Sequence, residues 1–276
     1  MKEALFADPS PEMLSLISDP ERVGSLPQGL QALESAAWSV RDRLSGDTWR
    51  VVNDIGVQLR ALTDESSTEL SEVLDELDPL ITALVAFSGL TDENMNHNEG
   101  WQFLEAGRRL ERGVNLATLL NTTLVPVTDE PEESLIIEAV LGITDSLITY
   151  RRRYQAGTRV GALLDLVFQN ESNPRSLAFQ LVQLERLMRE LPRTQFQMGR
   201  THPEKLALAA LTDVRLAELD ILTTPLPEAR MRQPLQQILQ RVADGLANLS
   251  NALTALYFRH EEQPHTLLSR YGQEEP

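Results

Sequence analysis

The stretch LQQILQRVADGLANLSNALTAL, residues 235–256, decides the fold class. Its apolar residues recur in alternating steps of four and three, which places them on one face of an α-helix. This stripe consists of Leu235, Leu239, Val242, Leu246, Leu249, Leu253 and Leu256. We therefore predict an amphipathic helix from about residue 230 to about residue 260.

Similar stripes recur along the rest of the chain. They begin at Leu30, Trp49, Phe103, Ile136 and Leu177, and each continues in steps of three and four residues. No run with the alternating pattern of a β-strand competes with them. The sequence thus predicts an all-α fold, a helical bundle of about seven to nine amphipathic helices.

An acidic stretch with two prolines, VPVTDEPEES at 125–134, separates two groups of stripes. Such a composition is typical of a connection between packed elements. We interpret it as a linker between halves at about 19–124 and 135–263. Together they form a single domain over 1–263, and residues 264–276 are expected to form a flexible tail.

A short internal repeat also appears in the chain. The pattern Ser-Leu-x-x-x-Leu-x-x-Leu-Glu occurs at 25–34 and again at 176–185. It indicates either two related halves or the common start of an amphipathic helix, and both interpretations stay open.

Composition excludes several classes of function. The chain has 276 residues, with 25 Lys and Arg against 41 Asp and Glu and a formal net charge of −16. This acidity argues against nucleic acid and anionic membranes as partners, because both attract basic surfaces. Cysteine is absent, so thiolate nucleophiles, disulfides and Cys-ligated zinc are excluded. We expect a cytoplasmic protein, because no signal peptide and no long apolar run is visible.

Metal and cofactor motifs are missing as well. Glu93 and His97 are four residues apart, a spacing that suits two metal ligands on one helix, but the sequence after Met95 is typical of a loop. No P-loop, dinucleotide-binding loop, nucleophile elbow or HExxH motif is present. We predict no metal site and no cofactor.

The basic residues are almost all arginine, since Lys2 and Lys205 are the two lysines of the chain. Arginine presents a planar fork that binds carboxylate or phosphate at two points. Either such binding or a skewed base composition of the gene explains this preference.

One charged cluster lies in GWQFLEAGRRLER, residues 100–112. Its members are spaced three or four apart, as ion pairs on a helix are: Glu105, Arg108, Arg109, Glu111 and Arg112. Glu111 borders the apolar stripe, so we expect it to be partly desolvated and paired with arginine. The cluster is either a structural ion-pair network or a ligand-facing site.

A second group of arginines follows later in the chain. Arg151 continues an apolar row and is expected to face another helix or a cavity, whereas the helix dipole explains Arg152 and Arg153. Arg175 lies two residues after Asn173, the expected N-cap. A cation at that position interacts unfavourably with the helix dipole, at a cost of about 0.3–1 kcal/mol. We expect an acidic side chain or an anionic ligand to compensate Arg175.

Several segments together resemble the alpha-E domain family. The resemblance covers about residues 19–260 in the family's order. It rests on FSGLTDENM at 87–95, GWQFL at 100–104, GRRLER at 107–112, SVRDRLS at 39–45 with Trp49, TYRRRY at 149–154, NPRSLAF at 173–179 and YFRH at 257–260.

The resemblance implies an all-helical domain of unknown function. Members of the family are fused to, or encoded beside, circularly permuted ATP-grasp proteins, often with transglutaminase-like proteins. It therefore implies an ATP-grasp protein or domain as partner, in cis or in trans, and a role in forming amides or modifying peptides. An anionic peptide is the candidate substrate.

The chain departs from the family's pattern in two places. Members usually begin with a helix that carries its own Gly-Arg-x-x-Glu-Arg motif, so this chain resembles a version without the first helix or a piece of a longer fusion. Residues 34–38, ESAAW, stand where many stand-alone members have Arg-Glu-Asn, which is closer to the ATP-grasp fusions.

The sequence-based hypothesis is an accessory domain that binds a partner or substrate through an anionic group. The candidate binding residues are Glu93, Asn94, Trp101, Arg108, Arg109, Glu111, Arg112, Arg151, Arg152, Tyr154 and Arg175. Two alternatives stay open: a structural interaction domain locked by ion pairs, and an enzyme that uses Glu93 and Glu111 as acid and base. No catalytic residue is assigned.

Overall fold

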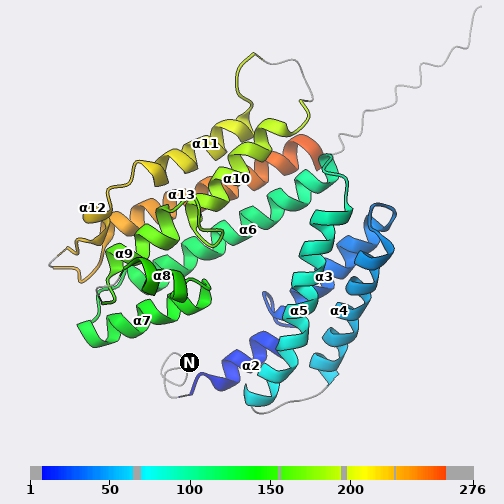
Figure 1. Ribbon diagram of the computed structural model, residues 1–276, viewed down its shortest axis with the longest axis horizontal. Coiled ribbons are helices and arrows are strands. Elements are labelled where there is room, and N and C mark those ends of the chain that lie inside the picture. Colours follow the sequence, from blue (N-terminus) through cyan, green and yellow to red (C-terminus); the bar gives the residue numbers. More distant parts are fainter. Residues whose placement is uncertain (1–7, 65–69, 155–156, 194–197, 227, 259–276) are drawn as a thin grey trace, which may run out of the picture. The chain divides into compact units, whose positions relative to one another are not determined.

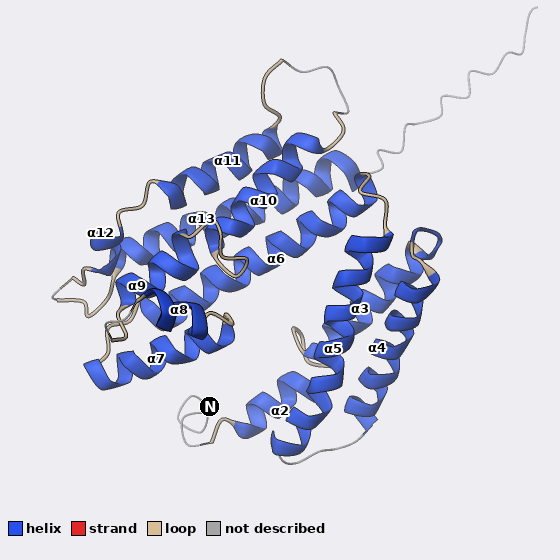
Figure 2. Ribbon diagram, viewed as in Figure 1, coloured by secondary structure: helices blue, strands red, loops and turns tan. Residues whose placement is uncertain are grey.

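The computed structural model describes residues 8–64, 70–154, 157–193, 198–226 and 228–258. Within these ranges the chain forms twelve α-helices and no named β-strand. Figure 2 shows helices joined by loops. The predicted all-α fold is therefore confirmed, although the number of helices exceeds the predicted seven to nine.

The additional helices have a physical explanation. The stripe that starts at Ile136 spans two helices, α7 (Glu130–Ile143) and α8 (Leu147–Arg153). Asp145 lies between them with φ 48°, a left-handed conformation that an α-helix does not continue through. Three other helices are too short to show a stripe: α2 (Ser10–Ser18), α9 (Val160–Leu164) and α12 (Leu219–Thr223).

The chain divides into two compact units, Met1–Trp101 and Gln102–Pro276. The first unit contains α2, α3 (Leu26–Ser39), α4 (Gly46–Asp64) and α5 (Leu70–Asn94), of which α4 packs against both α3 and α5 (Figure 1). The two predicted stripes supply Leu30, Ala37, Val52, Ile55 and Leu59 of its core. Helix α5 adds Leu80 and Phe87, which belong to no predicted stripe.

The second unit contains α7, α8, α9 and α12 and four further helices. They are α6 (Glu99–Leu124, whose first turn lies in the first unit), α10 (Leu177–Glu190), α11 (His202–Arg215) and α13 (Gln233–Leu253). Helix α11 packs against α10 and α13 (Figure 1). A Cβ atom at Gly113 of α6 would lie 2.9 Å from Cδ1 of Leu246, so α6 and α13 approach closely there.

The stripe of α13 is buried as predicted, except at its end. From Leu235 to Leu253 its members are at most 5% exposed, whereas Leu256 is 39% exposed. The α-helix passes into a π-helical turn at Thr254–Phe258. Because π-helical hydrogen bonds span five residues instead of four, the turn rotates the following side chains out of phase.

The predicted linker 125–134 lies inside the second unit and not at the boundary between the units. The backbone N–H of Val127 donates to the carbonyl of Arg230 at 2.9 Å, and that of Arg232 donates to the carbonyl of Val125 at 2.8 Å. The first part of this segment is therefore held by the loop before α13.

The rest of that segment is helical. Helix α7 begins at Glu130 with a proline in its first turn and three acidic residues there, which is the composition that favours a helix N-terminus. The predicted tail 264–276 lies outside the described residues. No described helix has both the length and the apolar composition needed to cross a membrane.

The internal repeat corresponds to two similar helix starts. Ser25 caps α3 by accepting from the N–H of Gln28, and Ser176 caps α10 by accepting from the N–H of Phe179. A serine N-cap before an apolar stripe accounts for the shared pattern without a duplication. Related halves stay a prediction.

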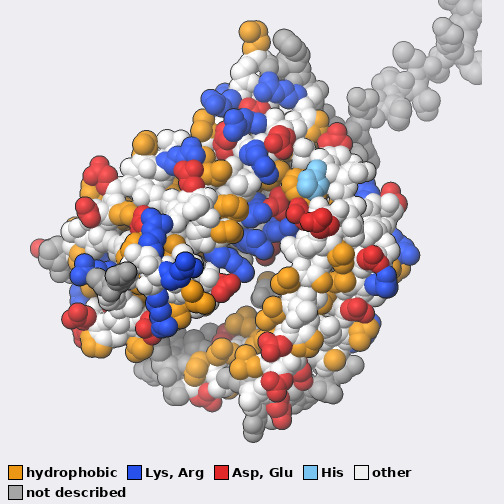
Figure 3. All heavy atoms as spheres, in the orientation of Figure 1, with side chains coloured by type: hydrophobic (Ala, Val, Ile, Leu, Met, Phe, Trp, Pro, Cys, Tyr) orange, Lys and Arg blue, Asp and Glu red, His pale blue; other side chains and the backbone are white. Residues whose placement is uncertain are grey.

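Acidic charge is concentrated in the first unit. Residues 1–101 contain 6 Lys and Arg against 19 Asp and Glu, whereas residues 102–276 contain 19 against 22. On the face shown in Figure 3, basic side chains gather over helices of the second unit. An anionic ligand is therefore attracted most readily to the second unit.

Candidate functional site

The polar face of α6 is organised around Glu105, which is buried. Arg108 Nη1 donates to Glu105 Oε2 at 2.8 Å, and Arg109 Nε donates to Glu105 Oε1 at 2.5 Å. Arg108 and Arg109 each lie about one helical turn after Glu105, the spacing at which side chains on a helix meet. Two charge-assisted contacts compensate for the desolvation of this carboxylate.

Arg109 links α6 to α10. Its Nη1 donates to Gln180 Oε1 at 3.1 Å, and its guanidinium carbon lies 5.3 Å from the ring centroid of Phe179. Gln180 is buried, and its Nε2 donates to the carbonyls of Pro174 at 2.6 Å and Ser176 at 3.1 Å. Arg109 is thus fixed in a structural network and is not available to a ligand.

The turn before α10 presents Arg175 to solvent. The sequence predicted Asn173 as the N-cap of α10, and this prediction is wrong. Asn173 accepts from the N–H of Arg175 at 3.1 Å, and Ser176 caps the helix instead. Arg175 therefore precedes the first turn of α10. The turn is fixed further by Asn173 Nδ2, which donates to the carbonyl of Leu166 at 3.0 Å.

Arg112 and Arg175 line one pocket of about 260 Å³ in the second unit. The complete lining consists of Arg112, Asn115, Leu116, Leu119, Ile143, Thr144, Pro174, Arg175 and Gln180. No carboxylate is among these residues, and within the described chain neither Arg112 nor Arg175 forms an ion pair. The pocket therefore offers two guanidinium groups whose charge is not neutralised by a neighbouring carboxylate.

The charges around Arg112 also favour the binding of an anion. Partial burial lowers the pKa of the Arg112 guanidinium, and the cations Arg109, Arg108 and Arg175 lower that pKa further, while Glu105 opposes them. The group keeps its charge at any physiological pH. An anion bound beside Arg112 relieves this repulsion.

The expectations for Glu111 and Arg151 are wrong, because both side chains are exposed. Glu111 was placed by a stripe through Phe103 and Leu110, which are only half-buried. The most buried positions of α6 are Ala106, Ala117, Leu120 and Leu124, a face on which Glu105 and not Glu111 borders the core. Arg152 is exposed too, as the dipole explanation allows.

Arg153 makes the contact that was expected of Arg151. Its Nη2 lies 3.1 Å from Asp165 Oδ2, and the Tyr154 hydroxyl donates to the same oxygen. These residues form a separate cluster in the second unit, and none of them lines the pocket.

Tyr154 makes the second unit sensitive to alkaline pH. Burial, followed by the hydrogen bond to Asp165, raises the pKa of Tyr154 far above its ordinary value of 10.0. The folded chain keeps a proton that the unfolded chain releases above about pH 10, so this stability is complete below about pH 10 and is lost as the pH rises further. Between about pH 9 and 12, the free energy of unfolding measured in urea is expected to fall less in Tyr154→Phe than in the wild type. An identical dependence of this free energy on pH in both proteins would contradict the assignment.

Glu93, Asn94 and Trp101 belong to the first unit and do not line the pocket. Glu93 is exposed, and Asn94 Nδ2 donates to Ser45 Oγ at 3.3 Å. The buried Trp101 stacks on His97 with ring centroids 3.8 Å apart. The contacts of Asn94 and Trp101 hold the end of α5 and the following turn, which is a structural role.

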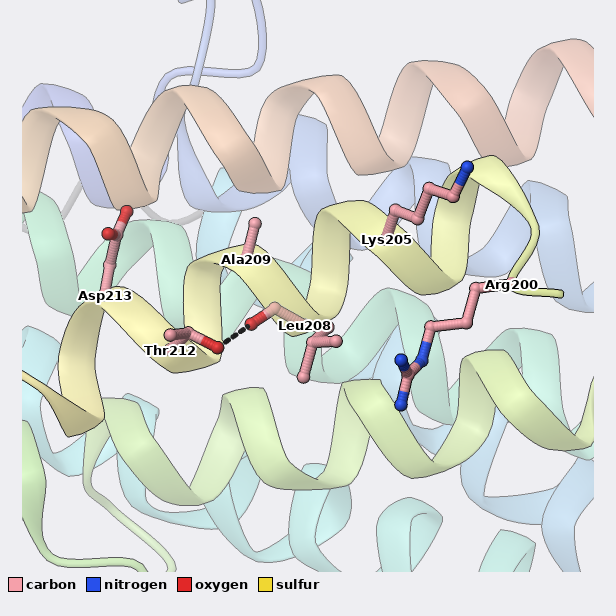
Figure 4. Close-up of a pocket in the computed structure, with 6 residues that line it drawn as sticks. All are labelled: Arg200, Lys205, Leu208, Ala209, Thr212 and Asp213. Atoms are coloured by element: carbon pink, nitrogen blue, oxygen red, sulfur yellow. Dashed lines mark hydrogen bonds between the residues drawn. The ribbon is translucent and has the colours of Figure 1, made fainter.

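A second pocket, of about 570 Å³, lies along α11 (Figure 4). Figure 4 shows Arg200 and Lys205 pointing to opposite sides of this helix, so their charges do not converge. The Thr212 hydroxyl donates to the carbonyl of Leu208 at 2.8 Å. Asp213 Oδ2 lies 3.6 Å from Nε of Arg241 in α13. These groups favour no common ligand.

A third pocket, of about 630 Å³, lies in the first unit. Trp38 and Trp49 line it and meet edge to face, and the guanidinium carbon of Arg41 lies 4.3 Å from the centroid of the Trp49 ring. Arg41 is engaged by this cation–π contact, and Asp42 lines the same pocket. An anion therefore finds less uncompensated charge here than beside Arg112.

Metal ligands do not gather in the described part of the chain, where no group of three or more His, Asp or Glu side chains is placed to hold an ion.

The sequence did not single out Asn115, Thr144 or Gln180 as candidate residues. Gln180 lies three residues after Leu177, beside the apolar stripe of α10, and a buried amide at that position has to find hydrogen-bond partners. That position was a usable signal. Asn115 and Thr144 carry no comparable signal, since they lie far apart in the sequence and come together only in the lining of the folded pocket.

Comparison with known proteins agrees with the helical fold. The model of a family named Alpha-E, described as "a predicted alpha-helical domain with a conserved ER motif", matches residues 3–258. Uncharacterized proteins of Mycobacterium tuberculosis and Mycobacterium bovis are 33% identical to the chain over 244 residues, which is 87% of the chain and 27% of each relative. The chain thus spans about a quarter of the length of these curated relatives. No solved structure matches it.

Proposed function

This chain belongs to the Alpha-E family of helical domains, and on that premise we propose that it is an accessory domain that binds an anionic group. The group belongs to a substrate or partner of an ATP-grasp-linked system that ligates amides or modifies peptides. The observation that carries the binding role is the pocket in which Arg112 and Arg175 meet without a carboxylate.

The geometry favours binding at Arg112 and Arg175 because three neighbouring candidates, Arg108, Arg109 and Arg153, already have acidic partners. Arg108 and Arg109 neutralise Glu105, and Arg153 contacts Asp165. Arg112 and Arg175 are exposed and share a pocket, which costs repulsion unless an anion is present. A carboxylate or phosphate is the group that guanidinium forks recognise.

The family description gives the pocket some further support. The chain contains the dipeptide Glu-Arg at 21–22, 111–112 and 185–186. In the first, Arg22 pairs with Glu12, and in the last, Glu185 pairs with Arg189. The arginine of the pair at 111–112 lines the pocket that also contains Arg175.

The ATP-grasp connection rests on the resemblance of the chain to a family whose members are fused to, or encoded beside, such proteins. The curated relatives are several times longer than the matched region, which leaves room in those proteins for further domains. We propose an ATP-grasp protein or domain as partner, in cis or in trans, and an anionic peptide as substrate.

The acid–base alternative has no observation in its favour. Glu93 and Glu111 are exposed and belong to different units, and no described contact joins them. The structural alternative explains Glu105, Arg109 and Gln180 well, but it leaves Arg112 and Arg175 without a role.

Binding of a fluorescein-labelled acidic hexapeptide, followed by fluorescence anisotropy at low salt, tests the anion-binding role. Arg112→Gln and Arg175→Gln are each expected to weaken binding by about tenfold or more, because a hydrogen bond to a charged group contributes about 1.5–3 kcal/mol. Arg200→Gln is the matched control, since Arg200 is equally basic and exposed but lines a different pocket. An unchanged affinity in the double variant, or an equal loss in the control, would overturn the role.

A further inference from the structure

Building on the proposed anion-binding function, we infer that the pocket receives the C-terminal residue of a peptide. The terminal carboxylate pairs with the guanidinium groups of Arg112 and Arg175. The side chain of the terminal residue is apolar and covers Leu119 and Ile143, so the pocket selects a chain end and not an anion in general.

The size of the pocket limits what enters it. Its volume of about 260 Å³ lies below the range of about 300–1,000 Å³ that is usual for cofactors and drug-sized ligands. The pocket is therefore small for a cofactor, whereas its volume suits a single residue. The remaining peptide chain can leave the pocket, because Arg112, Asn115 and Arg175 are exposed residues of its lining.

Two chemistries lie side by side in the lining. Arg112 and Arg175 form the basic part, while Leu116, Leu119 and Ile143 form an apolar wall. Ile143 is 67% exposed, so a ligand that covers it removes apolar surface from water. A terminal residue carries its carboxylate and its side chain on the same carbon and meets both parts at once, whereas inorganic phosphate meets only the basic part.

The neutral polar residues of the lining differ in their availability. The Thr144 hydroxyl donates to the carbonyl of Val140 at 2.8 Å, and both ends of the Gln180 amide are bonded. Asn115 has no hydrogen-bond partner among the described residues. Its side chain offers a donor and an acceptor, which match the carbonyl and N–H of the last peptide bond.

Titration calorimetry on the full 276-residue chain tests the inference with four probes. These are a neutral hexapeptide ending in leucine with a free carboxylate, its C-terminal amide, the same peptide ending in glycine, and inorganic phosphate. The free acid is expected to bind at least about tenfold more tightly than the amide. It is also expected to exceed the glycine peptide and phosphate, because neither of those covers the apolar wall.

Variants separate the two parts of the pocket. Arg112→Gln is expected to remove most of the preference for acid over amide, whereas Arg200→Gln leaves it unchanged. Ile143→Ser is expected to reduce the preference for leucine over glycine while the acid is still preferred over the amide. The replaced side chains are exposed, and the acid–amide comparison in the unaltered chain does not depend on any variant folding.

The outcomes distinguish this inference from the proposed function. If acid and amide bind equally, or phosphate binds as tightly as the leucine peptide, the inference is overturned. The anion-binding role survives that result as long as the acidic hexapeptide still depends on Arg112 and Arg175. If no anionic probe depends on these two arginines, both are overturned.

Discussion

Replacing Arg232 with alanine is expected to lower the free energy of unfolding by about 3–5 kcal/mol, the usual cost of breaking a buried ion pair from one side. The side chain is 5% exposed. Its Nη1 donates to the carbonyl of Leu124 at 2.9 Å, its Nε donates to that of Thr223 at 3.2 Å, and its Nη2 pairs with Glu133. The alanine variant leaves these acceptors without their donor.

Arg230 provides the matched control, two residues earlier in the same loop. Its ion pair with Asp129, at 3.2 Å, is exposed on both sides, so Arg230→Ala is expected to cost less than about 1 kcal/mol. Urea unfolding followed by circular dichroism measures both variants. A loss in Arg232→Ala no larger than that in Arg230→Ala would contradict the assigned network.

Replacing Glu105 with alanine is expected to destabilise the chain by roughly 2–4 kcal/mol. The change leaves Arg108 and Arg109 facing each other with their shared carboxylate gone, and their side chains are only 19% and 15% exposed. Because Arg109 also bonds Gln180, the contact between α6 and α10 is weakened as well.

Glu111→Ala is the control for this prediction, since Glu111 is on the same helix and exposed. Its expected effect is within about 0.5 kcal/mol, as for most surface substitutions. The same unfolding experiment applies. Equal effects at positions 105 and 111 would mean that the burial of Glu105 does not matter for stability.

Helices α3, α4, α6, α10 and α13 were predictable because each carries a stripe that has to be buried. The sequence failed where the backbone leaves the α-helical path: at Asp145, which separates α7 from α8, and at Thr254, where the π-helical turn exposes Leu256. Neither position contains glycine or proline, so composition gave no sign of the change. Such breaks depend on packing elsewhere in the chain.

The candidate site was predictable only in part. Spacing of four residues correctly pairs Glu105 with Arg109, because this contact lies within one helix. Arg108 pairs with Glu105 as well, and not with Glu111, which lies three residues after it. The meeting of Arg112 and Arg175 joins residues more than sixty positions apart, and local pattern carries no information about it. Glu111 was misjudged because its helix carries apolar residues on more than one side, which makes the phase of the stripe ambiguous.

The pocket draws its lining from three separate stretches of chain: the middle of α6, the end of α7, and the turn before α10 together with the first turn of that helix. A ligand seated there holds all three at once and binds the folded chain but not the unfolded one. Mass action then shifts the melting temperature upward. A free ligand concentration of 100 times the dissociation constant raises the free energy of unfolding by about 2.7 kcal/mol. A thermal-shift comparison of carboxylates and phosphates therefore reports which of these groups the folded chain binds, without any knowledge of the reaction.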